Sequence, residues 1–280
     1  MKAVHTIELM CQVLKVSRSG FYEWRGRPGR RPLEHRDLKE AIELHFKASR
    51  RTYGHRRVRQ CILDEGTSVS LKLTLRLMKE MALEAEPWKP SPYGAQRAAH
   101  ESKVCAHLLE RNFKPMAPNQ TWTSDITYIW TRNGWAYLAV VLDLFSRKVV
   151  GWSVSEKPDT NLVISALAQS LVSREYMRGK LMFHSDQGCQ YTSAELRQYL
   201  SERGILQSMS RRGQCWDNAP TESFFHTFKQ ETGIRKMPLK GLKEVEYLAL
   251  DWIETWYNLR RRHTFNGNSS PADYEMKWAA

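Results

Sequence analysis

The sequence has 280 residues, of which 41% are hydrophobic, and it carries a formal net charge of +13 with an isoelectric point of about 9.6. Such a chain can bury the core of one large domain and of smaller accompanying domains, and its positive charge favours a polyanionic partner. The densest apolar segment, "AYLAVVL", is far shorter than the roughly 20 residues of a membrane-spanning helix, and the five scattered cysteines form no CxxC pair, which argues against a membrane protein, a cysteine zinc site and a disulfide framework.

The first 35 residues (1–35) are predicted to form two short helices and a basic linker. Apolar residues recur at helical spacing in residues 7–14, and a second helix is expected over residues 17–24. A turn followed by a basic aromatic helix resembles half of a helix-turn-helix. The linker, residues 25–32, contains four arginines, which could lie along phosphates or could belong to a solvated connector.

A second, helix-turn-helix-like module is expected over residues 36–90. Its three helices are predicted over residues 37–46, with Asp37 as the N-cap, over residues 53–63 and over residues 70–83. The apolar face of the third helix is expected to consist of Leu71, Leu75 and Met78. Three short helices with a basic middle helix suit docking on DNA, although a small helical bundle that serves assembly has the same pattern.

Prolines separate this module from the rest of the chain. Pro87, Pro90 and Pro92 favour extended backbone over helix. Residues 91–114 are therefore expected to form a linker with a helical stretch around residues 103–113, and residues 115–280 are expected to form the larger domain.

Residues 121–155 have the pattern of an antiparallel meander. Strands rich in β-branched and aromatic residues are predicted over residues 121–130, 135–145 and 149–155. Asn133-Gly134 is a strong hairpin signal between the first two strands. The first strand alternates only imperfectly, which predicts burial on both of its faces.

Helices and strands alternate after this meander. A helix is predicted from Asp159, a strand over residues 180–185, a helix with a capping box from Thr192 to Glu195, and a fifth strand over residues 206–210. A further helix follows the last strand. Such alternation implies parallel pairing, so the order βββαβαβα predicts an α/β fold with a mixed five-stranded sheet.

Three acidic residues stand where this topology could gather them. Asp125 lies within the first strand, Asp186 directly follows the fourth, and Glu222 lies near the start of the helix after the fifth. Carboxylates that converge repel one another unless cations neutralise them, and Mg²⁺ prefers oxygen ligands. Taken singly, an aspartate at a strand end is more simply a cap or a turn residue, which is the role expected for Asp143.

The sequence motifs around these acids resemble those of a known family. The order Asp, Asp, Glu, with 35 residues between Asp186 and Glu222 (222 − 186 − 1), resembles the DDE signature of retroviral integrases and bacterial transposases. Five sequence motifs, in this order along the chain, resemble those of the second-frame (OrfB) transposases of the insertion-sequence family numbered three. They are "PNQTWTSDITYI", "LDLFSRKVVGW", "HSDQGCQYTS", "SMSRRGQCWDNAPTESFFHTFKQE" and "WYNLRRRHTFNG…SPADY". The segments "MCQVLKVSRSGFYEWR" and "YGHRRV", which are predicted to be helical, are similar to the N-terminal region of the same group.

The resemblance implies a ribonuclease-H-like core preceded by helix-turn-helix modules, and a DNA transposase that cuts element ends and joins them to target DNA. Asp125, Asp186 and Glu222 would be the catalytic residues and would hold two Mg²⁺ (or Mn²⁺) ions, which can clamp the attacking and leaving oxygens of a phosphodiester. The resemblance also implies a partner encoded by an upstream frame, separate or fused, a homo-oligomer, and a cytoplasmic, nucleoid-associated protein.

Basic residues outside the acid trio are expected to contact DNA. Lys229 lies two turns after Glu222 on the same helix face, where it could bind a phosphate or be a plain solvated lysine. The other expected contacts are Arg56, Arg57, Arg211, Arg212 and Arg261. Two alternative functions share most of these features: a metal-dependent nuclease without joining activity, and a DNA-binding regulator whose C-terminal part is catalytically inactive.

Overall fold

The computed structural model describes residues 6–26, 35–85, 108–109, 113–210, 218–236 and 239–280 of the chain. These residues form two compact units, Met1–Glu84 and Ala85–Ala280, and each is described here by itself. The expected helical stretch around residues 103–113 and most of the basic linker lie outside the described residues. No helix among the described residues has the length and apolar character needed to cross a membrane.

The first unit is all helical, as expected. It contains α1 (Ile7–Val13), α2 (Arg18–Gly26), α3 (Arg36–Ala48), α4 (His55–Asp64) and α5 (Leu71–Glu80). The helices α3, α4 and α5 pack on one another. The residues that form their common core include Ile42, Phe46, Val58, Ile62, Leu77 and Met78.

Two expectations for this unit were wrong. Asp37 lies inside the first turn of α3, because the helix begins at Arg36 and His35 occupies the cap position. The buried residues of α5 are Thr74, Leu77 and Met78, whereas Leu71 and Leu75 are exposed. The face of α5 that packs against α3 and α4 therefore begins at Thr74 and continues with Leu77 and Met78, whereas the apolar pattern had placed its start at Leu71.

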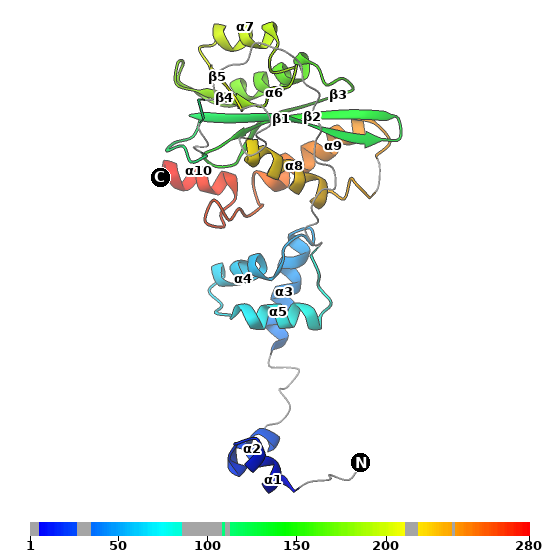
Figure 1. The fold of residues 1–280 in the computed structure, drawn as a ribbon, viewed down its shortest axis with the longest axis vertical. Coiled ribbons are helices and arrows are strands. Elements are labelled where there is room, and N and C mark those ends of the chain that lie inside the picture. The colour runs from blue at the N-terminus through cyan, green and yellow to red at the C-terminus, as the bar shows by residue number, and fades with distance from the viewer. Residues whose placement is uncertain (1–5, 27–34, 86–107, 110–112, 211–217, 237–238) are drawn as a thin grey trace. The chain divides into compact units, whose positions relative to one another are not determined.

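The second unit is built on the expected mixed five-stranded sheet, whose strands follow the order β3-β2-β1-β4-β5. The strands are β1 (Thr121–Thr131), β2 (Gly134–Asp143), β3 (Val149–Ser155), β4 (Met182–Ser185) and β5 (Leu206–Met209). The first three pair antiparallel, with Thr131 opposite Gly134 at the predicted hairpin, and β4 pairs parallel with both β1 and β5. Figure 1 shows β1 and β2 as the longest strands of the sheet.

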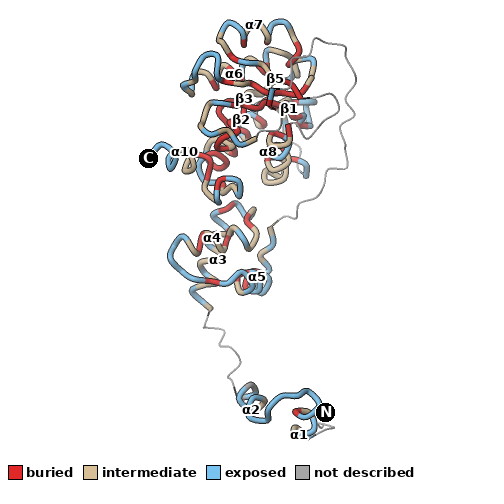
Figure 2. The backbone as a smooth tube through the Cα atoms, turned by 60° about the vertical axis from the view of Figure 1, so that its left-hand side comes forward, coloured by how far each residue is buried: buried red, intermediate tan, exposed pale blue. Residues whose placement is uncertain are grey.

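Helices cover both faces of this sheet (Figure 1). On one face α6 (Thr160–Ser173) and α7 (Ala194–Glu202) pack on a buried apolar cluster that includes Trp122 and Phe183. On the other face lie α8 (Ala219–Glu231), α9 (Leu242–Leu250) and the π-helix Asp251–Tyr257. Aromatic side chains of α8 pack edge-to-face against those of the π-helix. Figure 2 shows that the buried segments concentrate in the strands and on the inner sides of these helices.

Two local expectations for this unit were wrong. The side chain that caps α7 belongs to Ser193, which accepts from the Leu196 amide, whereas the Thr192 hydroxyl donates to backbone carbonyls of the preceding loop. Only the first half of β1 is buried on both faces; further along, Tyr128 and Trp130 are exposed. Near the end of this unit, Trp252 and Trp256 are buried but Leu259 is exposed, and helical structure ends at Tyr257.

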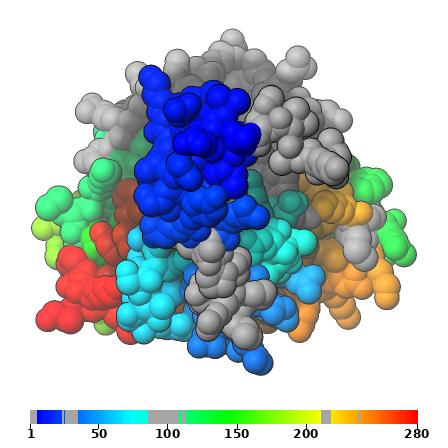
Figure 3. Space-filling view, turned by 90° about the horizontal axis from the view of Figure 1, so that it is seen from below, coloured from blue at the N-terminus to red at the C-terminus, as the bar shows by residue number. Residues whose placement is uncertain are grey.

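Ion pairs between largely buried side chains join the C-terminal helix α10 (Pro271–Ala279) to the sheet. The helix lies on the surface of the unit, where Figure 3 shows the C-terminal residues in red. Glu275 on α10 pairs with Arg174 and Lys148, and Arg174 lies 3.5 Å from the carboxylate of Asp143. This network joins α10 to the ends of α6 and β2.

Candidate active site

The two expected aspartates lie on neighbouring strands. The parallel register of β1 and β4 aligns Thr121 with Met182 and Thr123 with His184. Continued by two residues, this register brings Asp125 opposite Asp186, the first residue after β4. Neighbouring strands lie about 4.8 Å apart, and each aspartate is only 7% exposed. The register of the paired residues thus places Asp125 and Asp186 at the same level of the sheet, just beyond the last printed pair, Thr123 with His184.

Helix α8 is anchored to the face of β1 that carries Asp125. Thr123 and Asp125 share this face because side chains alternate along a strand. The Thr123 hydroxyl lies 2.7 Å from the hydroxyl of Thr221 on α8, and the Asn218 side chain donates to the Ser124 carbonyl at 3.2 Å. Both bonds are buried, and Glu222 follows Thr221 directly.

Glu222 itself is exposed on α8. Within the part of the chain that the structure describes, no three His, Cys, Asp or Glu side chains stand in an arrangement that could hold a metal ion. The structure thus places Asp125 on β1, Asp186 directly after the neighbouring strand β4, and Glu222 on the helix that packs on β1. It does not bring the three carboxylates into one ligand cluster.

The loop after β4 fixes the Asp186 carboxylate. Its Oδ1 accepts from the Gly188 amide at 3.0 Å, and a Cβ added at Gly188 would come within 3.1 Å of the same oxygen and 3.0 Å of Gln190. The Tyr191 hydroxyl bonds to Ser124 on β1 at 2.9 Å. A side chain at residue 188 would therefore require the Asp186 carboxylate and the Gln190 side chain to shift by a few tenths of an ångström.

Lys229 on α8 is half-buried, and its charge interacts with the carboxylate of Asp125. Its Nζ donates to the Tyr128 carbonyl at 2.7 Å, which ties α8 to β1 a second time. The pKa of Lys229 is lowered to about 8, first by burial and then by the positive charge of Arg235, while the carboxylate of Asp125 acts in the opposite direction. A half-buried ammonium next to Asp125 is thus a cation close to the candidate site.

The other expected DNA contacts fall into three groups. Arg56 is exposed on α4, and Arg57 lies over the ring of Tyr53, 5.4 Å from its centroid. Arg211 and Arg212 lie outside the described residues.

The expectation for Arg261 was wrong. Its side chain is 7% exposed and its Nε donates to Glu231 at 2.9 Å, so the guanidinium joins the C-terminal segment to α8 instead of facing solvent. A run of basic residues indicates a phosphate surface only if the tertiary fold leaves those side chains outside, and here α8 supplies a buried partner.

Asp143 has the structural role expected for it. Its two carboxylate oxygens accept from two different backbone amides, Asn119 at 2.8 Å and Phe145 at 2.9 Å. Burial raises the pKa of Asp143 to about 6 despite these bonds and the nearby Arg174. The side chain therefore holds the start of β1 against the β2–β3 turn.

Sequence reasoning missed the residues that position the acids. Thr123, Asn218 and Thr221 form the buried bonds that seat α8, and Gly188 leaves room for the Asp186 carboxylate. All four lie inside the sequence motifs that carry the family resemblance, and those motifs were the signal that could have indicated them. Their individual roles depend on contacts between β1 and α8 that no local pattern encodes.

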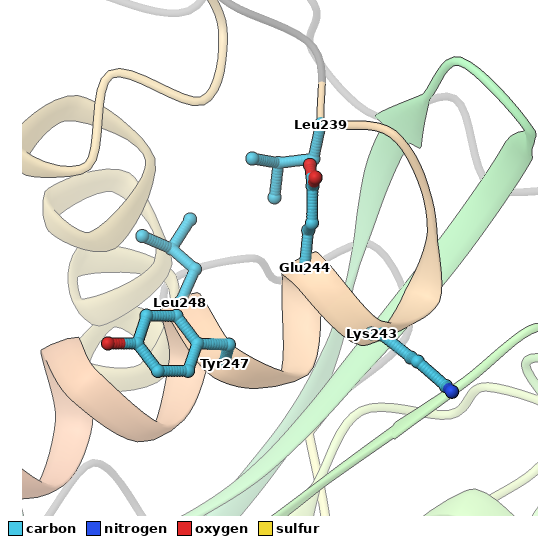
Figure 4. Close-up of a pocket in the computed structure, with 5 residues that line it drawn as sticks. All are labelled: Leu239, Lys243, Glu244, Tyr247 and Leu248. Atoms are coloured by element: carbon cyan, nitrogen blue, oxygen red, sulfur yellow. The ribbon is translucent and has the colours of Figure 1, made fainter.

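One apolar hollow lies elsewhere on this unit (Figure 4), at the start of α9. Its lining residues are Leu239, Lys243, Glu244, Tyr247 and Leu248. None of these is an expected site residue. A mostly apolar lining offers no chemistry for a phosphodiester, so the hollow is not the candidate site.

The sheet order, the helices on both faces and the two aspartates on adjacent strands define a ribonuclease-H-like domain of the integrase type. Integrase core domain models match residues 115–215 and 203–271, and an HTH-like domain model matches residues 33–90. A chain of the simian T-cell lymphotropic virus intasome, solved with PP2A regulatory subunit B56 gamma, aligns at a TM-score of 0.50 and 14% identity over 84% of this chain and 74% of that chain. The fold prediction is therefore confirmed.

Two curated relatives are similar over nearly the whole chain. The transposase InsF for insertion sequence IS3A of Escherichia coli (strain K12) is 36% identical over 99% of this chain and 96% of its own length. An uncharacterized 31 kDa protein of insertion element IS600 from Shigella sonnei is 36% identical over 96% of this chain and 98% of its own length. The chain belongs to the IS3 family of insertion-sequence transposases, as the sequence motifs indicated.

Replacing Arg261 by methionine should destabilise the second unit by about 3–5 kcal/mol, because the Glu231 carboxylate would stay buried without its partner. Urea unfolding measures this loss. Adding Glu231→Gln should recover much of it, since glutamine carries no charge and can still accept from Trp256. The salt dependence of DNA binding should not change. An Arg261→Met variant with wild-type stability and a shallower salt slope would instead mean that Arg261 contacts phosphate.

Proposed function

We propose that this chain is a DNA transposase that cuts at the ends of an insertion sequence and joins the freed ends to target DNA, with Asp125, Asp186 and Glu222 as its catalytic residues. The observation that carries the proposal is the parallel β1–β4 register, which makes Asp125 and Asp186 neighbours in a chain of a transposase family. The anchoring of α8 next to Glu222 supports the third residue.

The donor set suits hard divalent cations. All three groups are carboxylates, and Mg²⁺ is commonly bound by one or two carboxylates together with phosphate oxygens and water. Asp125 and Asp186 are both largely removed from solvent, so their negative charges are costly unless cations offset them. Two bound Mg²⁺ (or Mn²⁺) ions would activate a water or a DNA 3′-hydroxyl and stabilise the leaving oxygen.

The protein itself would contribute position and charge. Gly188 and its amide orient the Asp186 carboxylate, and the threonine pair orients the start of α8. Lys229 would pair with a DNA phosphate beside Asp125. Because the nucleophile is water or a DNA hydroxyl, no serine or tyrosine has to form a covalent bond with DNA.

The helical unit would bind DNA. Its HTH-like match and the exposed Arg56 support a phosphate-binding role for α4, with Arg57 beside it. We further propose that the chain works as a homo-oligomer, because two DNA ends must be handled together. It would act with the product of an upstream frame, or fused to it, in the cytoplasm and at the nucleoid.

The Asp186→Asn variant tests the catalytic assignment. It should bind end DNA normally but lose strand transfer by more than about a hundredfold, which exceeds the usual cost of removing an outer-shell partner of a metal. The assay uses a pre-cut, labelled element end with target DNA and Mg²⁺. Glu195→Gln, the same acid-to-amide change at an exposed position on α7, should join at the wild-type rate.

Three outcomes of this assay would contradict the proposal. Joining by Asp186→Asn at a near-normal rate would remove the metal assignment. Wild-type protein that nicks DNA but never joins it would identify a nuclease without joining activity, and wild-type protein that does neither would point to a DNA-binding regulator.

The phosphate role of Lys229 predicts a pH dependence. Its lowered pKa means that the ammonium is charged below about pH 8 and loses its charge as the pH rises through that value. Affinity for end DNA, measured by fluorescence anisotropy without divalent ions, should therefore fall between pH 7 and pH 9 more for the wild type than for Lys229→Arg. Lys229→Ala should reduce the salt slope by about 1 at pH 7. Parallel pH profiles for the wild type and Lys229→Arg would contradict this role.

A further inference from the structure

The turn between α3 and α4, together with the start of α4, concentrates positive charge in the helical unit. Residues 44–63 contain six lysines and arginines and no acidic residue. We give the name basic corner to four of them, of which the first three are exposed and the last lies over the ring of Tyr53: Arg50, Arg51, Arg56 and Arg57.

The acidic residues that flank this stretch have other partners. Glu43 pairs with a lysine of its own helix, and Glu65, which follows the end of α4, pairs with His45. Within the part of the chain that the structure describes, no ion pair joins Arg51 or Arg56 to an acid. The charges of these two arginines are therefore not neutralised by the described residues.

Two of the four arginines occupy backbone positions that favour glycine. Arg50 and Arg51 have φ angles of 55° and 61°, in the left-handed region, where a side chain costs conformational free energy and glycine does not. Their amides end α3 by donating to the carbonyls of Lys47 and Phe46, each at 3.0 Å. Glycine is the usual residue at the first of these positions, and glycine stands at the corresponding position after α4, α7 and α8.

The other two arginines oppose the dipole of α4. Arg56 and Arg57 lie in its first turn, which contains no acidic residue, although negative side chains are the ones that stabilise this end of a helix. All four arginines thus stand where folding of the unit would favour another residue. Such local conflicts are expected where a site binds a partner, and a polyanion is the partner whose charge would compensate for them.

We propose that the basic corner binds the sugar–phosphate backbone of duplex DNA. The proposal rests on the DNA-binding role proposed above for the helical unit, and it adds Arg50 and Arg51 to the DNA contacts of α4. A turn between two helices is neither a helix nor a β-ribbon that the major groove admits, so its arginines would meet phosphates and not base edges. The corner would therefore hold DNA without reading its sequence.

Glycine at both turn positions removes the charge and relieves the backbone at the same time. Arg50→Gly/Arg51→Gly should lower the slope of log affinity against log salt concentration by about 2, and should weaken binding at 0.1 M salt by more than about tenfold. The loss should be equal for an element-end duplex and for a shuffled one. Fluorescence anisotropy of the full chain, without divalent ions, measures both quantities. The urea midpoint of the helical unit should not fall, because glycine adopts the left-handed backbone freely.

Three further variants separate charge from backbone. Arg50→Lys/Arg51→Lys keeps both charges and should keep the wild-type salt slope. Arg36→Gln/Lys39→Gln removes two charges near the start of α3, where both are paired with acids, and it should also keep that slope. Ala82→Gly changes a left-handed residue after α5 without changing the charge, and it should bind both duplexes as the wild type does.

Four results would overturn the proposal: a wild-type slope in the glycine variant, an equal loss of slope in the lysine variant or in Arg36→Gln/Lys39→Gln, a loss confined to one duplex, or a loss accompanied by a lower urea midpoint. A wild-type slope in the glycine variant would leave the DNA-binding role of the unit standing. A wild-type chain whose affinity for DNA does not depend on salt would remove that role as well. Because no catalysis is involved, these results are independent of the Asp186→Asn assay.

Discussion

The parallel pairing of β1 with β4 is the constraint on which the rest of this structure depends. β1 is the central strand: β2 pairs with one edge, and β4 pairs with the start of the other. A slip of one residue in the β1–β4 register would turn the side chains of one strand to the wrong face. It would separate Asp125 from Asp186, and it would also turn either Trp122 or Phe183 out of the apolar cluster they share. Core packing and the position of the acids are therefore fixed by the same register.

The second constraint is the seating of α8. The threonine pair Thr123–Thr221 and the Asn218 side chain are buried polar contacts, and leaving any of them unpaired would cost free energy. They fix the start of the helix just before Glu222, and Lys229 fixes it two turns later on Tyr128. The Arg261–Glu231 ion pair holds the far end of α8 to the C-terminal segment. The helix that carries the third acid is thus held along its whole length, while Glu222 itself stays exposed.

Much of the fold could be predicted from the sequence, because its signals are local. Asn133-Gly134 marked the hairpin, and Asp159 marked the start of α6, where its side chain caps the helix. Placing Asp125 beside Asp186 needed only the assumption that the first and fourth strands are neighbours. What failed depended on distant partners: Arg261 was expected to face DNA but is buried against Glu231, and the exposure of Tyr128 and Trp130 follows from where α6 and α7 end. The net charge of +13 therefore indicated a polyanionic partner without indicating which arginines would meet it.

The central claim is that Asp125, Asp186 and Glu222 share divalent cations when DNA is bound. Anomalous diffraction from crystals of the chain grown with an element-end oligonucleotide and Mn²⁺ would test it most directly. The account predicts Mn²⁺ peaks bounded by oxygens of all three carboxylates, with two peaks about 3.5–4 Å apart. Peaks that contact Asp125 and Asp186 but leave Glu222 turned to solvent, or peaks held by other residues, would contradict it.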